Sequence, residues 1–356
     1  MRTLTTSRTD HDEARDRGAV LVLFALLIVA LLGIGALVID IGALYAERRQ
    51  LQNGADAGAL AVAQDCAGGD CANATGTAKQ YADLNAKDDV SAVDLLCGVG
   101  PGLAPCADPP PAGASSASGW VRVRTRTETP DGGDQVSFVL APIMNAMTGA
   151  TVRATAVAAW GPLGSASTLP FTISDCIFSA FGGDLDPDDP VIPTGIVTLY
   201  SKASTGGGQG GGQGGEALPY ELCGTEPGGG TASGNFGWLE HDVECISEVD
   251  AQSTVGGDTG NSVVAKCRSR FPQIGDVVVL PVYSTVSGSG TNAVYSIVGF
   301  VGFQLTGYDV PAWGKAGGVN CAGNEWCIQG AFESVVTGGD FGTGVDFGAR
   351  AIKMVG

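Results

Sequence analysis

The feature that most constrains this chain is an uninterrupted apolar stretch near its N-terminus. Residues 18–39 carry no charged side chain. As a helix rising about 1.5 Å per residue, these 22 residues extend about 33 Å, enough to cross a hydrocarbon core of about 30 Å. The apolar core of a cleaved signal peptide is shorter, about 7–15 residues, although Ala43 to Ala46 loosely matches a cleavage pattern. We therefore predict an uncleaved signal anchor, with a transmembrane helix over residues 18–41.

The charges and cysteines on either side of this stretch predict its direction. Four arginines precede it and only two follow it closely: Arg2, Arg8, Arg15 and Arg17 before, Arg48 and Arg49 after. Positive charge is retained on the cytoplasmic side of a membrane span. All ten cysteines lie after the stretch, where an oxidising compartment would suit them. We expect a single-pass cell-membrane protein with a cytoplasmic tail over residues 1–17 and a large C-terminal body outside.

The cysteines themselves predict a set of disulfides, because their number is even. A zinc site would need C-x-x-C pairs or nearby histidines, and we expect neither, since the only histidines are His11 and His241. Short spacings favour three local pairs: Cys66–Cys71, Cys97–Cys106 and Cys321–Cys327. The remaining four would pair among themselves in an order that the sequence leaves open: Cys176, Cys223, Cys245 and Cys267.

The helix is expected to continue outside the membrane to about Gln64, because apolar residues still recur at helical spacing. Gly54 and Gly58 form a G-x-x-x-G pattern, with Ala55 and Ala59 beside them. Small residues at this spacing allow another backbone to approach closely. A helical Gly costs about 1 kcal/mol relative to Ala, which indicates a packing reason for both glycines. The four residues predict a helix-packing surface, covered either by this chain or by a partner helix.

The rest of the chain predicts an α+β fold in two parts. Residues 42–160 would form the helical extension and a small α+β unit, with a second helix, a loop, a short helix and two strands at 73–86, 98–119, near 141–147, 120–128 and 150–160. Residues 161–356 alternate strand-like runs with Gly, Asp and Pro turns, and no helical pattern is convincing there. We predict an all-β, disulfide-stapled domain with a flexible Gly-rich insert at 205–215.

Composition and motifs exclude several functions. The net charge of −18 opposes nucleic-acid binding, so Arg122, Arg124 and Arg126 are interpreted as the wetted side of a strand. His241 is the only histidine of the exported body, and neither a G-x-S-x-G nor a phosphate-binding loop occurs. We expect no enzyme activity and no cofactor.

One acidic turn offers a weak metal candidate. Asp184, Asp186 and Asp188 alternate as in a calcium loop. However, Asp189 stands where such a loop needs Gly, and Gly195 stands where it needs a bidentate Glu. We therefore expect a solvated acidic turn rather than a bound metal.

The N-terminal residues resemble a known family. The stretch in question is RGAVLVLFALLIVALLGIGALVIDIGALYAERRQLQNGADAGALAVA, with Arg17-Gly18 before the span, Asp40 and Gly42 at its outer end, and Ala55-Asp56-Ala57 beyond. It is similar to the N-terminal segment of TadE/TadG-like proteins of Flp (Tad) pilus assembly. The resemblance implies a membrane-anchored, non-enzymatic envelope component whose partners are other pilus-assembly membrane proteins or pseudopilins.

A departure from the family pattern refines this expectation. Pseudopilins of the TadE type commonly carry Glu at the fifth position after the processing Gly, and here that position is Leu23. Cleavage after Gly18 is therefore disfavoured, and the resemblance implies a permanent anchor of the TadG type. The alternative to a pilus-assembly role is an exported adhesin or ligand-binding module that uses the β-rich domain.

Overall fold

The computed structural model describes residues 10–114, 117–139, 142, 147–184, 190–200, 223, 236–259, 263, 266–268, 271–310, 313–321 and 326–355. Asp186, Asp188, the insert at 205–215, the first nine residues of the tail and most of the short helix expected near 141–147 lie outside these residues. The chain forms two compact units, which are described separately. The first comprises residues 1–58, 78–95 and 124–155, and the second comprises 59–77, 96–123 and 156–356.

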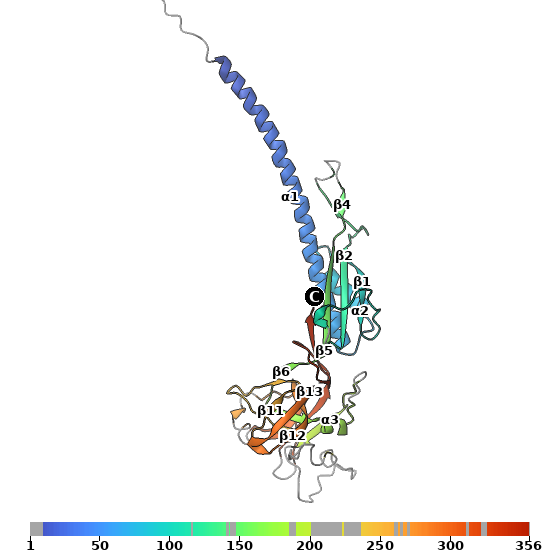
Figure 1. Cartoon of the computed structure of the whole chain (residues 1–356), viewed down its shortest axis with the longest axis vertical. Helices are drawn as coiled ribbons and strands as arrows, with labels where there is room; N and C mark the ends of the chain where they lie inside the picture. The colour runs from blue at the N-terminus through green and yellow to red at the C-terminus, as the bar shows by residue number, and fades with distance from the viewer. Residues whose placement is uncertain are drawn as a thin grey trace, which may run out of the picture. The chain divides into compact units, whose positions relative to one another are not determined.

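The N-terminal helix is one unbroken element, α1 (Asp10–Ala67), of 58 residues (Figure 1). It includes the apolar stretch and continues three residues beyond the predicted end at Gln64. The helix ends where Gly68 and Gly69 follow, and Gly69 adopts a positive φ of 93° that a residue without a side chain takes without strain. The second helix, α2 (Ala74–Leu84), matches the predicted position within two residues.

A five-stranded sheet has the order β1-β2-β5-β18-β16. Its strands are β1 (Ser91–Val99), β2 (Gly119–Thr127), β5 (Arg153–Pro162), β18 (Ala349–Met354) and β16 (Val335–Gly338). The predicted strands at 120–128 and 150–160 are confirmed as β2 and β5, whereas β1 was not expected. The C-terminal strand pairs antiparallel with β5, with Arg350 opposite Pro162. The sheet therefore contains both early and late parts of the chain.

A nine-stranded sheet forms most of the second unit. Its main order is β8-β15-β13-β12-β7-β9, and three short strands pair with β13. These strands are β7 (Phe171–Ser174), β8 (Ile196–Tyr200), β9 (Phe236–Trp238), β11 (Thr254–Gly256), β12 (Val277–Ser287), β13 (Val294–Val310), β14 (Gly314–Ala316), β15 (Cys327–Glu333) and β17 (Val345–Asp346). Two-stranded ribbons join β6 (Ser165–Thr168) to β10 (Ser247–Asp250), and β3 (Val136–Ser137) to β4 (Gly149–Ala150).

The expectation that no helix follows residue 161 is wrong, because α3 (Asp175–Ala180) lies there, beside β12 (Figure 1). Ser174 caps this helix by accepting a hydrogen bond from the N–H of Cys176 at 3.1 Å. Asp175 adds an acidic side chain to the first turn, which favours helix initiation. Six residues are too few for a helical period to be recognised in the sequence. Short 3-10 turns also occur at Ala112–Ala114 and Gly290–Asn292.

Apolar side chains of the second unit gather in two buried clusters. One contains Phe178, which meets Phe347 edge-on with ring centroids 5.2 Å apart. The other contains Tyr283 and Tyr295, also edge-on, at 5.0 Å. Such pairs add about 0.5–1.5 kcal/mol beyond the area that they bury. The clusters lie on strands from all parts of the unit, so this part of the chain has a substantial hydrophobic core.

Five disulfides reinforce the second unit. The structure joins the three local pairs that the short spacings favour, Cys66–Cys71, Cys97–Cys106 and Cys321–Cys327. The order left open by the sequence is Cys176–Cys223 and Cys245–Cys267. No cysteine among the described residues is a free thiol. The longest closed loop, of 47 residues, is that of Cys176–Cys223.

Candidate functional site

The N-terminal half of α1, here Val20 to Ile41, presents an apolar surface on every side. Its large apolar side chains from Val20 to Ile41 are between 39% and 70% exposed. Within the described residues, this is one helix that is long and apolar enough to cross a membrane, and none of its most apolar window is buried. Each exposed Leu, Val or Ile forgoes about 1.5–3 kcal/mol of burial free energy. A surface of this kind requires an apolar environment that the described part of the chain does not supply.

Asp40 interrupts this surface at its C-terminal end. The residue is only 7% exposed, and its Oδ1 accepts a hydrogen bond from the backbone N–H of Val139 at 2.9 Å. A hydrogen-bonded carboxylate satisfies part of the desolvation cost that a buried charge otherwise incurs. Asp40 therefore fastens the chain near β3 to the helix at the level where the apolar surface stops.

Aromatic and basic side chains follow within the next two helical turns. The guanidinium of Arg49 lies 5.0 Å from the ring centroid of Tyr45. A groove of about 450 Å³ is formed here by one stretch of α1 and one stretch before and within β5: Ile41, Leu44, Tyr45, Arg48, Ala150, Thr151, Val152 and Arg153. Tyr and Arg are side chains with an apolar body and a polar tip, and they suit the boundary between hydrocarbon and water.

The predicted helix-packing surface lies against α2 of the same chain. A Cβ on Gly54 would approach the Cα of Ala82 to 3.1 Å, and one on Gly58 would approach the carbonyl oxygen of Ala78 to 3.1 Å. Ala55 and Ala59 are fully buried. Small residues thus permit two helices to pack almost backbone to backbone. Of the two coverings left open by the sequence, the structure supplies the one from within the chain.

Hydrogen bonds from side chains to backbone carbonyls attach α1 to the strands beside it in the first unit. The hydroxyl of Thr125 on β2 donates to the carbonyl of Leu51 at 2.8 Å, in a buried position. The amide of Gln52 donates to the carbonyl of Thr155 on β5 at 3.3 Å. The C-terminal half of α1 is therefore enclosed by α2 and the sheet, in contrast to its N-terminal half.

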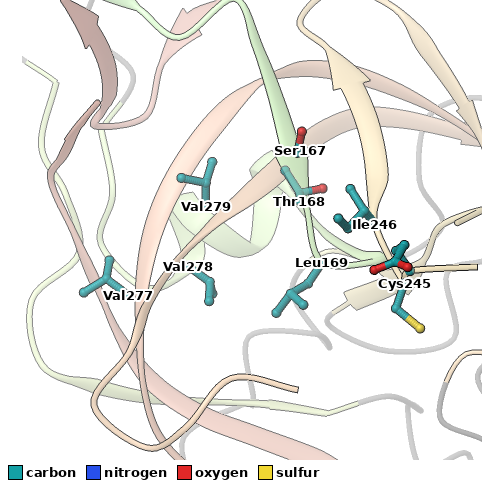
Figure 2. Close-up of a pocket in the computed structure, with 9 residues that line it drawn as sticks. Ser167, Thr168, Leu169, Cys245, Ile246, Val277, Val278 and Val279 are labelled. Atoms are coloured by element: carbon teal, nitrogen blue, oxygen red, sulfur yellow. The ribbon is translucent and has the colours of Figure 1, made fainter. Parts of the chain in front are cut away.

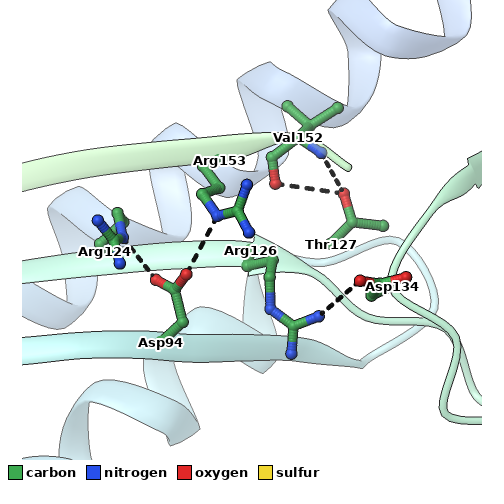
Figure 3. A network of polar contacts seen from close by, with 7 residues as sticks. All are labelled: Asp94, Arg124, Arg126, Thr127, Asp134, Val152 and Arg153. Carbon is green, nitrogen blue, oxygen red and sulfur yellow. Dashed lines mark hydrogen bonds and ion pairs between the residues drawn. The ribbon is translucent and has the colours of Figure 1, made fainter. Parts of the chain in front are cut away.

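The arginines of β2 pair with carboxylates of the same chain (Figure 3). Asp94 accepts hydrogen bonds from Arg124 at 2.7 Å and from Arg153 at 3.2 Å. Burial alone would raise the pKa of the Asp94 carboxyl, but the hydrogen bonds from both arginines outweigh it and hold that pKa below its ordinary value. Arg126 lies 3.7 Å from Asp134. These contacts pair the arginine side chains with carboxylates of the same chain.

The acidic turn brings no ligand set together among the described residues. Asp184 pairs through its backbone with Val191, with reciprocal N–H to carbonyl distances of 3.0 and 3.1 Å. Asp186 and Asp188 lie outside the described residues. The calcium-like pattern therefore carries no further argument.

An apolar groove of about 370 Å³ lies between the β6–β10 ribbon and the beginning of β12 (Figure 2). Nine residues line it: Ser167, Thr168, Leu169, Glu244, Cys245, Ile246, Val277, Val278 and Val279. Most of the lining is aliphatic, and Glu244 is its one charged member. The groove is open to solvent and reaches one cysteine of a disulfide.

That disulfide adjoins the one structural feature that the sequence interpretation excluded, a histidine near cysteines. Ligand atoms of His241, Cys245 and Cys267 all lie within 4.8 Å of one another. The side chain of His241 is 2% exposed, and neither ring nitrogen has a hydrogen-bond partner. An unpaired buried polar group costs about 1–3 kcal/mol. The spacing His241-x-x-x-Cys245 was present in the sequence and is the signal that could have found this cluster.

Comparison with known proteins places the N-terminal segment. Residues 18–65 match the family model described as putative Flp pilus-assembly TadE/G-like. The match covers most of α1 and agrees with the resemblance noted from the sequence, while the β-rich remainder lies beyond it. No curated protein and no solved structure matches the chain.

Proposed function

We propose that this protein is a membrane-anchored, non-enzymatic component of Flp/Tad-type pilus assembly, which acts as a scaffold or contact protein in the cell envelope. The observation that carries the proposal is the exposed apolar surface of α1 from Val20 to Ile41, which lies within the matched residues 18–65. A helix that is apolar all round is suited to lipid or to other apolar helices. The family match supports pilus assembly as the process in which it acts.

For this role we divide the chain by function. Residues 1–17 form a cytoplasmic tail, residues 18–41 span the membrane, residues 42–160 form the helical extension with its α+β unit, and residues 161–356 form the exported β-rich domain. The five disulfides support an exported body, because they persist in oxidising compartments. Partners would be other assembly membrane proteins or pseudopilins, which meet the apolar surface of α1 inside the bilayer.

Orientation can be tested separately from function. A reporter that is active only outside the cytoplasm, fused after Gly356, should be active in whole cells. A matched reporter that is active only in the cytoplasm should be silent at the same position. The reverse pattern would contradict an exported body.

The function is tested by deleting the gene in a piliated host and counting pili by electron microscopy. We expect few or no pili, and full recovery when the complete chain is restored. Residues 42–356 exported behind a cleaved signal should not restore pili, because they lack the anchor. The same residues behind an unrelated single-span anchor separate tethering from specific helix contact. A deletion strain with normal pili would refute the proposal.

A further inference from the structure

We infer that His241, Cys245, Cys267 and Asp258 form a zinc site when a thiol reductant opens the Cys245–Cys267 disulfide. The site goes beyond the proposed role in pilus assembly and depends on none of its steps. It is a metal site that alternates with a disulfide.

The ligand set has the chemistry that zinc prefers. Three ligand atoms, one from imidazole and two from sulfur, already lie within 4.8 Å of one another. Asp258 adds a carboxylate, whose Oδ2 lies 3.7 Å from Nδ1 of His241. Zinc binds Cys sulfur at about 2.3 Å, His nitrogen at about 2.0–2.1 Å and carboxylate oxygen at about 2.0–2.2 Å, in a tetrahedron. In such a tetrahedron two sulfurs are about 3.8 Å apart, so the opened pair needs only a small separation.

His241 is the residue that points to a ligand. Its side chain is 2% exposed, and both ring nitrogens lack a hydrogen-bond partner. Buried polar groups in proteins are almost always paired. A metal ion held by one ring nitrogen would satisfy a group that the oxidised form leaves without a hydrogen bond.

The surrounding backbone holds the ligands in place. Asp242 accepts hydrogen bonds from the N–H groups of Glu244 at 2.8 Å and Ile246 at 3.0 Å, which fixes the turn between His241 and Cys245. On the other side, the N–H of Cys267 donates to the carbonyl of Val263 at 2.8 Å. Backbone hydrogen bonds thus hold the turn that carries Cys245 and the N–H of Cys267.

A surface groove lies next to the buried disulfide, whose Cys245 and Cys267 are 2% and 3% exposed. Cys245 lines the apolar groove beside β12, which opens to solvent (Figure 2). In the reaction, two thiols of the reductant become one disulfide, and the cystine becomes two thiols. Zinc binding then displaces two protons as both thiols become thiolates.

The test uses the full chain purified in detergent micelles, treated with a dithiol reductant and then loaded with zinc. Zinc retained after gel filtration is measured by elemental analysis, and cobalt is used as a spectroscopic probe of thiolate ligation. Cysteines that have been opened are mapped by alkylation and mass spectrometry. We expect about one tightly held zinc per chain, and tetrahedral thiolate–cobalt bands.

Variants separate this site from thiols released elsewhere. Cys245→Ser with Cys267→Ser should lose the tight zinc, whereas Cys321→Ser with Cys327→Ser should keep it. His241→Ala should weaken binding by more than about 100-fold, the upper end of what loss of an outer-shell partner costs. The inference is overturned if Cys245 and Cys267 remain oxidised while the chain stays folded. It is also overturned if the first double variant retains the metal, or if His241→Ala leaves the cobalt spectrum unchanged.

Discussion

Apolar residues occur in both the N-terminal and the C-terminal half of α1, yet they meet opposite environments. From Val20 to Ile41 the side chains are large and exposed, whereas Leu51, Ala55 and Val62 are at most 3% exposed. The two halves differ in side-chain size and in polarity, since the C-terminal half also carries charged residues such as Glu47, Arg48 and Asp56. Large branched residues project in every direction and suit a fluid apolar solvent, while Gly and Ala allow fixed neighbours such as α2 to approach closely. One continuous helix thus changes its surroundings without changing its backbone.

The largest effect is expected when the apolar N-terminal half of α1 is made polar. Leu27→Arg combined with Leu31→Arg places two charges in the middle of the apolar stretch. Each charge at the centre of a span costs about 2.5–3.5 kcal/mol of insertion free energy, so the pair costs about 5–7 kcal/mol. We expect the protein to leave the membrane fraction after alkaline extraction. Changing both leucines to Ile should leave the protein in the membrane fraction. If the charged variant also stays in the membrane fraction, this stretch is not the membrane anchor.

The C-terminal half of α1 is tested by adding side-chain volume where α1 contacts α2. Gly58→Val should lower the free energy of unfolding by up to about 3 kcal/mol, because the new side chain meets the backbone of Ala78. Gly42→Val is the matched control, since nothing lies within 4 Å of a Cβ at that position. Thermal unfolding in detergent micelles compares the two variants. Equal melting temperatures would show that the packing at Gly58 contributes little.

The C-terminal end of α1 is held by a short disulfide-closed loop, Cys66–Cys71. Replacing Cys66 and Cys71 by Ser should cost about 2 kcal/mol, because the loop of 5 residues restricts the unfolded chain only modestly. Chemical denaturation under oxidising conditions measures this loss. The same pair of variants under reducing conditions should unfold together with the wild type, and a persistent difference would assign the effect to packing instead.

The smallest effect is expected from the ion pairs of the five-stranded sheet. Asp94→Asn should cost about 1 kcal/mol or less near pH 7. Because the pKa of Asp94 is lower in the folded state, its contribution is present above the ordinary carboxyl pKa and is lost as the pH falls through the folded value. The stability difference between wild type and variant should therefore shrink below about pH 4. A difference that grows in acid would contradict the assigned direction.

Local patterns in the sequence predict the parts that depend on local chemistry. The apolar stretch, its helical continuation and the small-residue surface are all readable, because each is a property of residues within a few turns. The partner of Gly54 and Gly58 was left open, since the approach of α2 depends on how the chain folds back. The turn closed by the Cys66–Cys71 disulfide brings α2 back against α1. The spacing of five residues between these cysteines does not specify the direction in which α2 returns.

Elements that depend on distant residues were missed or left unassigned. The strand β1 shows no clear alternation of apolar and polar residues. The strand β18 pairs with β5 although most of the second unit lies between them in the sequence. The cluster at His241 illustrates the same limit. Its first two members are four residues apart, but Cys267 and Asp258 reach it only through the packing of separate loops.

The unbroken course of α1 also sets a rotational phase. Successive residues of an α-helix turn by about 100°, so the direction in which Asp40 points is fixed relative to that of Gly54 and Gly58. One residue inserted between positions 42 and 50 would turn the N-terminal half by about 100° against the C-terminal half and separate Asp40 from Val139. Seven residues would restore the rotation to within about 20° but would move Asp40 about 10 Å along the helix axis, so the contact would again be lost. The hydrogen bond between Asp40 and Val139 therefore fixes both the rotation and the length of this part of the helix.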